Sequence, residues 1–277
     1  MKKFKVGLQL YSIRDKMAEN MDEALKAVKE MGYDYVEFAG FFEHPADEVK
    51  ALLEKHGLTA ISVHQPIDLF LEDPDGTIEY FKTVGVEFAV IPWYDVKKLK
   101  GAEDWEKTVA AFTAYGKALR ENGIQLLYHN HDFEFKKFEE KYLLDWLYEE
   151  VPAEYLQPQI DTCWVHYAGE APADYMRKYS GRLEVLHLKD FECEKLGGGP
   201  VYALIGDNGE EKEKPSKEET GFRFRPVGHG IQNFNEILAA AEETGVEYVI
   251  VEQDDSYDTP SLETARLSRD YLKTLGI

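Results

Sequence analysis

The stretch Leu183-Glu184-Val185-Leu186-His187-Leu188-Lys189-Asp190 decides the fold, because it is a short apolar run that ends in polar, chemically useful side chains. A strand that is buried on both faces of a parallel sheet has this pattern. Two further apolar runs, at 155–160 and 247–251, end in the same way, with Asp161 and Glu252. Residues just past the strands of an α/β barrel face its catalytic end. The three runs therefore predict a polar site at one end of a barrel.

The rest of the chain alternates between apolar runs and amphipathic helical segments. Further strands are predicted at 6–10, 35–38, 58–63, 88–91 and 124–128, and helices at 21–31, 47–56, 75–84, 104–121, 142–150, 172–179, 233–244 and 261–275. Glycines such as Gly32 and Gly245 stand where helices should end. Eight strand–helix units predict one (β/α)₈ TIM barrel domain over residues 1–277. A doubly wound open sheet is the alternative, but no glycine-rich phosphate loop follows the first strand.

Residues 191–225 interrupt this alternation. The segment follows the seventh strand, contains a Gly-Gly-Gly-Pro run and many charges, and lacks periodicity. A loop of this length is usually functional or disordered. We expect an excursion over the catalytic face that is more mobile than the barrel. Its candidate roles are a lid or an oligomer contact, and the alternative is a surface insertion without a function.

Composition excludes several classes of partner. The net charge of −21 repels phosphate backbones, so we expect neither nucleic acid nor an anionic membrane as a partner. The two cysteines form no disulfide framework, which fits a reducing compartment. The N-terminal residues lack the long apolar stretch of a signal peptide or membrane span. We therefore expect a cytoplasmic protein.

Asp161, His187 and Glu252 are the first candidates for a metal site. Oxygen and imidazole ligands suit Mn²⁺, Mg²⁺, Co²⁺ or Zn²⁺. Each of these residues alone is more often a structural polar group than a ligand. Three of them on successive strand ends favour a site, because the barrel places those ends on one face.

The fifth strand should supply a fourth ligand. It runs into Tyr128-His129-Asn130-His131-Asp132-Phe133-Glu134. Strand alternation places His129 and His131 on the same side, where one of them can face the metal or the substrate. Glu134 can fold back from the next turn as a carboxylate ligand. The alternative for the histidines is that they cap the strand end by hydrogen bonding.

The chain resembles the sugar phosphate isomerase/epimerase group of xylose isomerase-like TIM barrels, nearly from end to end. The resemblance rests on four motifs that occur in order: Val6-Gly7-Leu8-Gln9-Leu10-Tyr11-Ser12-Ile13-Arg14-Asp15, His187-Leu188-Lys189-Asp190, Val227-Gly228-His229-Gly230-Ile231 and Val249-Ile250-Val251-Glu252-Gln253-Asp254. Each motif alone is weak, but together they are fairly specific.

The resemblance implies one divalent ion held by Glu, Asp, His and Glu from strands five to eight. Asp161, His187 and Glu252 match the last three positions. The first position falls near Tyr128 or His129, where this chain has no carboxylate, and we take Glu134 as its substitute. A second departure is Trp164, because many epimerases of the family carry a histidine three residues after the aspartate.

In the family, the metal polarises a carbonyl while carboxylates move a proton between neighbouring carbons. Glu134 and Glu252 are candidate bases as well as ligands. His131 is a candidate proton shuttle, and Lys189 is a candidate for oxyanion stabilisation or a surface lysine. The candidate substrate-binding residues are Tyr11, Arg14, His64, His129, Trp164 and Arg225.

The leading expectation is a metal-dependent isomerase or epimerase of a sugar, sugar phosphate or keto-polyol, which works through a metal-stabilised enediolate. A homo-oligomer is a candidate assembly. The alternative within enzymes is a lyase or dehydratase acting on a keto-inositol or 3-keto-glycoside. A nuclease, as in the related abasic-site endonucleases, is opposed by the charge of −21. A non-catalytic sugar-binding barrel is the alternative from another class, and metal content would distinguish it.

Overall fold

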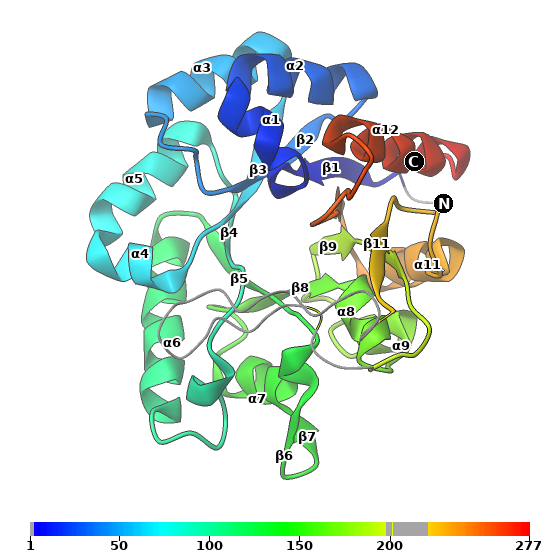
Figure 1. The fold of residues 1–277 in the computed structure, drawn as a ribbon. Helices are drawn as coiled ribbons and strands as arrows, with labels where there is room; N and C mark the ends of the chain where they lie inside the picture. Colours follow the sequence, from blue (N-terminus) through cyan, green and yellow to red (C-terminus); the bar gives the residue numbers. More distant parts are fainter. Residues whose placement is uncertain (1–2, 198–200, 202–220) are drawn as a thin grey trace.

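The computed structural model describes residues 3–197, 201 and 221–277. Eight parallel strands close into a barrel in the order β1-β12-β9-β8-β5-β4-β3-β2, and helices surround the ring (Figure 1). The prediction of a single-domain TIM barrel is confirmed, and the open sheet is excluded. The barrel strands are β1 (Lys5–Gln9), β2 (Tyr35–Ala39), β3 (Thr59–His64), β4 (Phe88–Ile91), β5 (Gln125–His129), β8 (Gln157–Asp161), β9 (Val185–Leu188) and β12 (Tyr248–Val251).

The predicted helices form with small shifts at their ends. Helix α2 shows why: Asn20 caps its first turn through the amide of Glu23, its apolar stripe is buried, and Gly32 ends it at φ 94°. Those helices are α2 (Met21–Met31), α3 (Ala46–His56), α5 (Pro74–Val84), α6 (Trp105–Glu121), α7 (Leu143–Glu150), α9 (Pro172–Arg177), α11 (Phe234–Thr244) and α12 (Ser261–Thr274).

Several short elements were not predicted, because each is too short to show a period. They are helices α1 (Arg14–Glu19), α4 (Ile67–Glu72) and α8 (Thr162–Tyr167), the 3₁₀ turns at Leu10–Ile13, Val96–Lys98 and Phe133–Phe135, and the hairpin of β6 (Lys137–Phe138) and β7 (Lys141–Tyr142). No helix in the described part of the chain is long and apolar enough to cross a membrane.

The barrel interior has an apolar part and a polar part, and the polar part lies at the C-terminal ends of the strands. The apolar part is a buried cluster of Ile61, Phe88, Val90, Leu127, Val185, Tyr248 and Ile250. A β-bulge marks the change: Val36 pairs with Ala60, but Glu37 pairs with Ser62, which leaves one residue of β3 unmatched. Bulges re-aim side chains near active sites. Here Ser62 and His64 are both turned toward Glu37.

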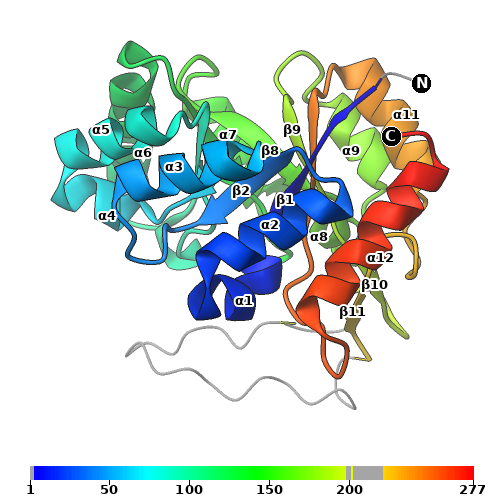
Figure 2. The same ribbon diagram turned by 90° about the horizontal axis from the view of Figure 1, so that it is seen from above.

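The segment at 191–225 begins and ends as a hairpin rather than as irregular loop. Strand β10 (Asp190–Glu192) pairs antiparallel with β11 (Arg223–Arg225). In Figure 2 this hairpin and α1 lie toward the same end of the barrel, as elements that follow the C-terminal ends of strands should. The expected mobility and the lid or oligomer role concern mainly residues 198–200 and 202–220, which lie outside the described residues.

Candidate metal centre

Four ligand-type side chains converge at the C-terminal ends of the strands. His129, Asp161, His187 and Glu252 each offer one atom, and these atoms lie within 4.8 Å of one another. His187 Nδ1 is 3.0 Å from Glu252 Oε2, and His129 Nε2 is 3.6 Å from Asp161 Oδ2. All four residues are buried. We call this set the outer group. Asp161, His187 and Glu252 are three of the sequence-predicted ligands, and His129 stands where Glu134 was expected.

Lys189 lies among the carboxylates of this end of the barrel. Its Nζ is 2.8 Å from Glu252 Oε2, 3.1 Å from Asp161 Oδ2 and 3.1 Å from Asp254 Oδ2. Lys189 is only 1% exposed, so it is part of the interior and not a surface lysine. Burial lowers its pKa, but the three carboxylates outweigh burial and raise it well above the usual value. The side chain is therefore a buried ammonium group.

The buried carboxylates around Lys189 can be neutralised further by a second cation. Burial raises the pKa of Asp161 to about 6, even though Lys189 and His187 oppose the shift. Asp161 Oδ2 is buried and accepts no well-aligned hydrogen bond from the described residues, although Lys189 is near. Ligand atoms at about 2.0–2.2 Å from one ion lie roughly 3–3.6 Å apart, as the closest outer-group pairs do. The donor set therefore fits a divalent cation.

Beneath the outer group, Glu37 is the centre of a buried hydrogen-bond network. Its Oε1 accepts from Gln9 Nε2 at 2.7 Å and faces His187 Nε2 at 2.7 Å and His64 Nε2 at 2.8 Å. Its Oε2 accepts from Ser62 Oγ at 2.5 Å and from Gln159 Nε2 at 2.6 Å. Burial raises the pKa of Glu37, but His64 and His187 outweigh burial and hold it well below the usual value.

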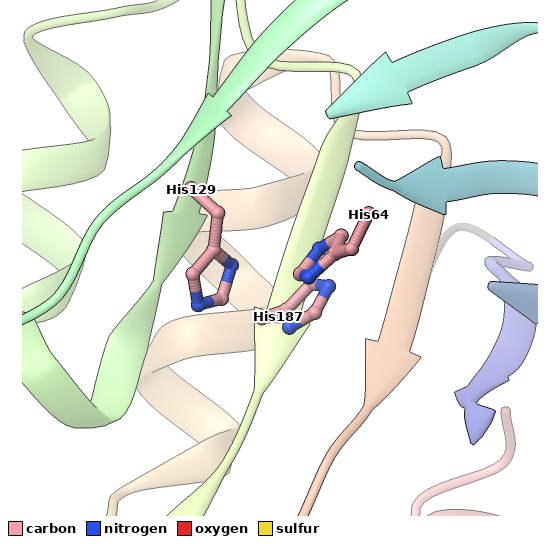
Figure 3. Close-up of side chains that lie close together, drawn as sticks. All are labelled: His64, His129 and His187. Atoms are coloured by element: carbon pink, nitrogen blue, oxygen red, sulfur yellow. The ribbon is translucent and has the colours of Figure 1, made fainter. Parts of the chain in front are cut away.

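His64, His129 and His187 form a second group of potential ligands. Figure 3 shows the three rings close together inside the barrel, each from a different strand. The His64 and His187 rings stack with centroids 5.3 Å apart, and those of His129 and His187 are 4.6 Å apart. We call this set the inner group. It shares His129 and His187 with the outer group. The two groups are therefore alternative positions for one ion, unless both shared imidazoles bridge two ions.

Glu134 does not join either group. Its carboxylate accepts from the Tyr128 hydroxyl at 2.7 Å and from the backbone N–H of His131 at 2.8 Å. Tyr128 alternates with His129 along β5 and points outward, toward Tyr148 on α7. Glu134 is therefore bonded to a residue on the outward face of β5, away from the barrel interior. Burial raises its pKa to about 8, so it is largely protonated at neutral pH.

His131 and Trp164 lie next to the outer group: the His131 ring is 5.2 Å from the His129 ring, and Trp164 is beside Lys189. The His131 ring stacks on Phe133 and lies 5.7 Å from the Trp164 ring. Burial lowers the pKa of His131 to about 3, which keeps the imidazole neutral. Trp164 stacks on Phe222, and Lys189 Nζ is 5.2 Å from the centre of its ring. These residues form an aromatic wall beside the ammonium group.

The other predicted substrate residues are distributed more widely. His64 belongs to the inner group. Arg14 lies over the exposed Tyr11 ring and donates to the backbone carbonyl of Asp254, so both residues stand at the rim. Arg225 forms an ion pair with Glu192 across the β10–β11 hairpin. Arg225 also lines a cleft together with His229 and Tyr257.

Sequence reasoning missed Glu37, Gln159 and Asp254. Glu37 carried a signal, because it is a charged residue in the middle of the apolar run Tyr35-Val36-Glu37-Phe38. A charge buried in a strand needs partners, which marks it as structural or functional. Gln159 gave a weaker signal two residues before Asp161, on the same face of its strand. Asp254 stands two residues after Glu252, which is the spacing between Gln159 and Asp161.

The comparisons with known proteins match nearly the whole chain. The xylose isomerase-like TIM barrel family model matches residues 25–275. An inosose dehydratase of Mesomycoplasma hyopneumoniae is 25% identical over 92% of this chain and 89% of its own length. A sugar phosphate isomerase/epimerase structure from Parabacteroides distasonis superposes with a TM-score of 0.76, at 21% identity, over 99% of this chain and 94% of that one.

A structure of the IolI protein with a bound zinc atom superposes with a TM-score of 0.68. It is 16% identical and covers 98% of this chain and 97% of that one. At these identities the two solved structures establish the fold alone. The family model covers far more than half of the sequence, including all four residues of the outer group. The chain therefore belongs to the xylose isomerase-like TIM barrel family.

Proposed function

We propose that this protein is a divalent-metal-dependent dehydratase that removes water from a keto-inositol or a similar cyclic keto-polyol. The observation that carries the proposal is the outer group, two imidazoles and two carboxylates buried at the barrel mouth with Lys189 beside them. The 25% identity to a protein named inosose dehydratase, over 92% of the chain, supports dehydration over the isomerisation that the sequence first suggested.

His129, Asp161, His187 and Glu252 would hold the cation, through one ligand atom each. Once bound, the cation would polarise the ketone oxygen of the substrate and stabilise negative charge on it. The zinc in the structurally similar IolI protein supports a metal in this fold, and the donor set suits Mn²⁺, Co²⁺ or Zn²⁺ well, with Mg²⁺ less favoured because of its preference for oxygen.

The chain itself supplies the proton transfers. Elimination breaks a C–H bond next to the ketone and a C–O bond one carbon further on, and a C=C bond forms between the two carbons. His131, whose imidazole is neutral and lies beside His129, would accept the proton. Lys189, whose ammonium lies within 3.1 Å of three carboxylates, would protonate the departing hydroxyl, which leaves as water.

The walls of the site suit a cyclic polyol. The centres of the Trp164 and Phe224 rings lie 5.2 and 5.8 Å from Lys189 Nζ, and Phe222 stacks on Trp164; all three side chains are buried. Aromatic rings bind the C–H faces of a sugar ring, while the polar groups fix its hydroxyls. Asp254, whose Oδ2 is near Lys189 and whose backbone carbonyl accepts from Arg14, would orient a hydroxyl at the rim.

The test is incubation of the Mn²⁺-loaded protein with 2-keto-myo-inositol, followed by mass spectrometry and ultraviolet absorbance. We expect loss of one water and the absorbance of a conjugated product. A product of unchanged mass that carries solvent deuterium would instead establish an isomerase or epimerase. Stoichiometric binding of the ketone without conversion would indicate a sugar-binding barrel. Lys189→Met should lose turnover while still binding metal.

A further inference from the structure

The two groups of potential ligands differ in which nitrogens of the shared histidines they use. The outer group uses His187 Nδ1 and His129 Nε2, which face Glu252 and Asp161. The opposite nitrogens, His187 Nε2 and His129 Nδ1, face Glu37 Oε1 and Gln159 Oε1 at 2.7 and 3.0 Å. His64 Nε2 lies 2.8 Å from each of these two oxygens, so these are the nitrogens that an inner-group ion would use. A neutral imidazole has one N–H and one lone pair, so its tautomer decides which group can hold a metal.

We propose that Glu37 is a positioning residue that selects the outer group as the cation site, by fixing the tautomers of His187 directly and of His129 through Gln159. This inference rests on the metal site proposed above and concerns residues that do not themselves touch the ion. A histidine ligand commonly donates its second N–H to a carboxylate or carbonyl, which sets its orientation.

The step from Glu37 to His187 follows from the direction of one hydrogen bond. Glu37 is completely buried, and its five contacts are three definite donors, from Gln9, Ser62 and Gln159, and two imidazole nitrogens, from His187 and His64. An ionised carboxylate can only accept hydrogen bonds. His187 Nε2 must therefore carry the hydrogen, which leaves the lone pair of a neutral His187 on Nδ1, beside Glu252.

The step from Glu37 to His129 passes through a side-chain amide. Gln159 Nε2 donates to Glu37 Oε2 at 2.6 Å, and this contact fixes which end of the amide faces the histidines. Gln159 Oε1 then accepts from His129 Nδ1 at 3.0 Å, and it lies 2.8 Å from His64 Nε2. His129 therefore carries its hydrogen on Nδ1 and presents the Nε2 lone pair toward Asp161.

The same contacts close the inner group to a cation. The three nitrogens concerned are His187 Nε2, His64 Nε2 and His129 Nδ1, and each faces Glu37 Oε1 or Gln159 Oε1. Each of these two oxygens is already in contact with two of the rings. A metal there would have to displace N–H hydrogens that the buried carboxylate and amide stabilise. His64 is thus a member of the supporting network and not a ligand.

The direct test is a long-range ¹H–¹⁵N correlation spectrum of [¹⁵N]histidine-labelled protein loaded with Zn²⁺, with signals assigned from single His→Gln variants. We expect His187 to be ligated through Nδ1 and protonated at Nε2, and His129 to be ligated through Nε2 and protonated at Nδ1. Ligation through the opposite nitrogens, or ligation by His64, would overturn the inference while leaving a metal site intact. A wild-type protein that binds no Zn²⁺ would overturn the proposed function and this inference together.

A second measurement compares two variants that alter the same carboxylate's contacts. Glu37→Gln removes the charge that faces His187, and we expect Zn²⁺ affinity to fall roughly 10- to 100-fold. Ser62→Ala removes a donor to the other oxygen of Glu37 and touches no histidine, so we expect less than about a threefold change. Equal effects of the two variants, with both folded by circular dichroism, would show that Glu37 serves only to hold the barrel interior together.

Discussion

Lys189 Nζ lies 2.8 Å from Glu252 Oε2, at the same carboxylate oxygen that faces His187 Nδ1 at 3.0 Å. The ammonium and the imidazole therefore share one buried oxygen, and Lys189 partly compensates a cluster that also contains Asp161 and Asp254. A divalent ion and the lysine are complementary in this arrangement, because together they balance carboxylates that neither would balance alone.

The first prediction concerns Lys189→Met, which keeps the length of the side chain and removes its charge. Breaking a buried ion pair by removing one partner costs about 3–5 kcal/mol, so the metal-free variant should unfold at a clearly lower temperature than the wild type. Excess Mn²⁺ should restore more stability to the variant than to the wild type. Thermal unfolding with and without chelator measures both effects. Equal unfolding temperatures of the two metal-free proteins would show that the ammonium does not balance the cluster.

The second prediction separates the two candidates for the fourth ligand. His129→Ala should weaken Mn²⁺ binding at least 100-fold, because it removes one of four donors. Glu134→Gln should change the affinity less than about threefold, because Glu134 is bonded to Tyr128 and the His131 amide behind the strand. Titration calorimetry of the two variants measures the difference. The reverse order of effects would restore Glu134 as the ligand.

The third prediction is the pH dependence of metal affinity. Burial lowers the pKa of His187, but Glu37 and Glu252 outweigh it and raise the pKa to about 10, whereas Asp161 titrates at about 6. Metal must displace the extra proton of His187 at neutral pH, so affinity should rise roughly tenfold per pH unit above about 6. Below about 6 a second proton competes on Asp161, and the dependence should steepen. Mn²⁺ titrations from pH 5.5 to 8.5 measure the slope, and a flat profile would contradict the assignment of His187 as a ligand.

The fourth prediction concerns stability at Glu134. Its pKa is raised from 4.5 in the unfolded chain to about 8 by burial, so the folded state binds the proton more tightly than the unfolded state. The favourable contribution is complete below pH 4.5 and is lost as the pH rises through about 8. Glu134→Gln cannot ionise, so its stability relative to the wild type should increase by on the order of 3–5 kcal/mol between pH 4.5 and 8.5. Denaturant unfolding at several pH values provides the measurement, and a stability difference that does not vary with pH would count against the buried, protonated state.

The barrel was predictable from the sequence because its signals are local and repeated. Apolar runs such as 88–91 and helices that end at glycines such as Gly32 each specify one element, and eight repeats specify the closed sheet. The convergence of Asp161, His187 and Glu252 was predictable for the same reason, since each stands at the end of such a run. The short helix α1 and the β10–β11 hairpin escaped prediction because they are three to six residues long and depend on contacts made elsewhere.

The hydrogen-bond network around Glu37 was harder to predict from the sequence, because residues that meet across a barrel have no characteristic spacing along the chain. Glu37 and His187 are 150 residues apart, and the bulge in β3 that turns Ser62 toward Glu37 arises from strand register. The choice of Glu134 failed to anticipate that Tyr128 faces outward and binds it there. Alternation along β5 turns Leu127 and His129 into the barrel interior and Tyr128 outward, and His129 is the one of these that lies in the outer group.

Titration calorimetry of the chelator-treated protein with Mn²⁺, carried out beside His187→Ala, tests the central claim most directly. We predict one Mn²⁺ per chain for the wild type and no measurable binding for the variant, with both proteins folded by circular dichroism. Retention of wild-type Mn²⁺ affinity in His187→Ala, or absence of Mn²⁺ binding in the wild type, would contradict the assignment of the outer group as a metal centre.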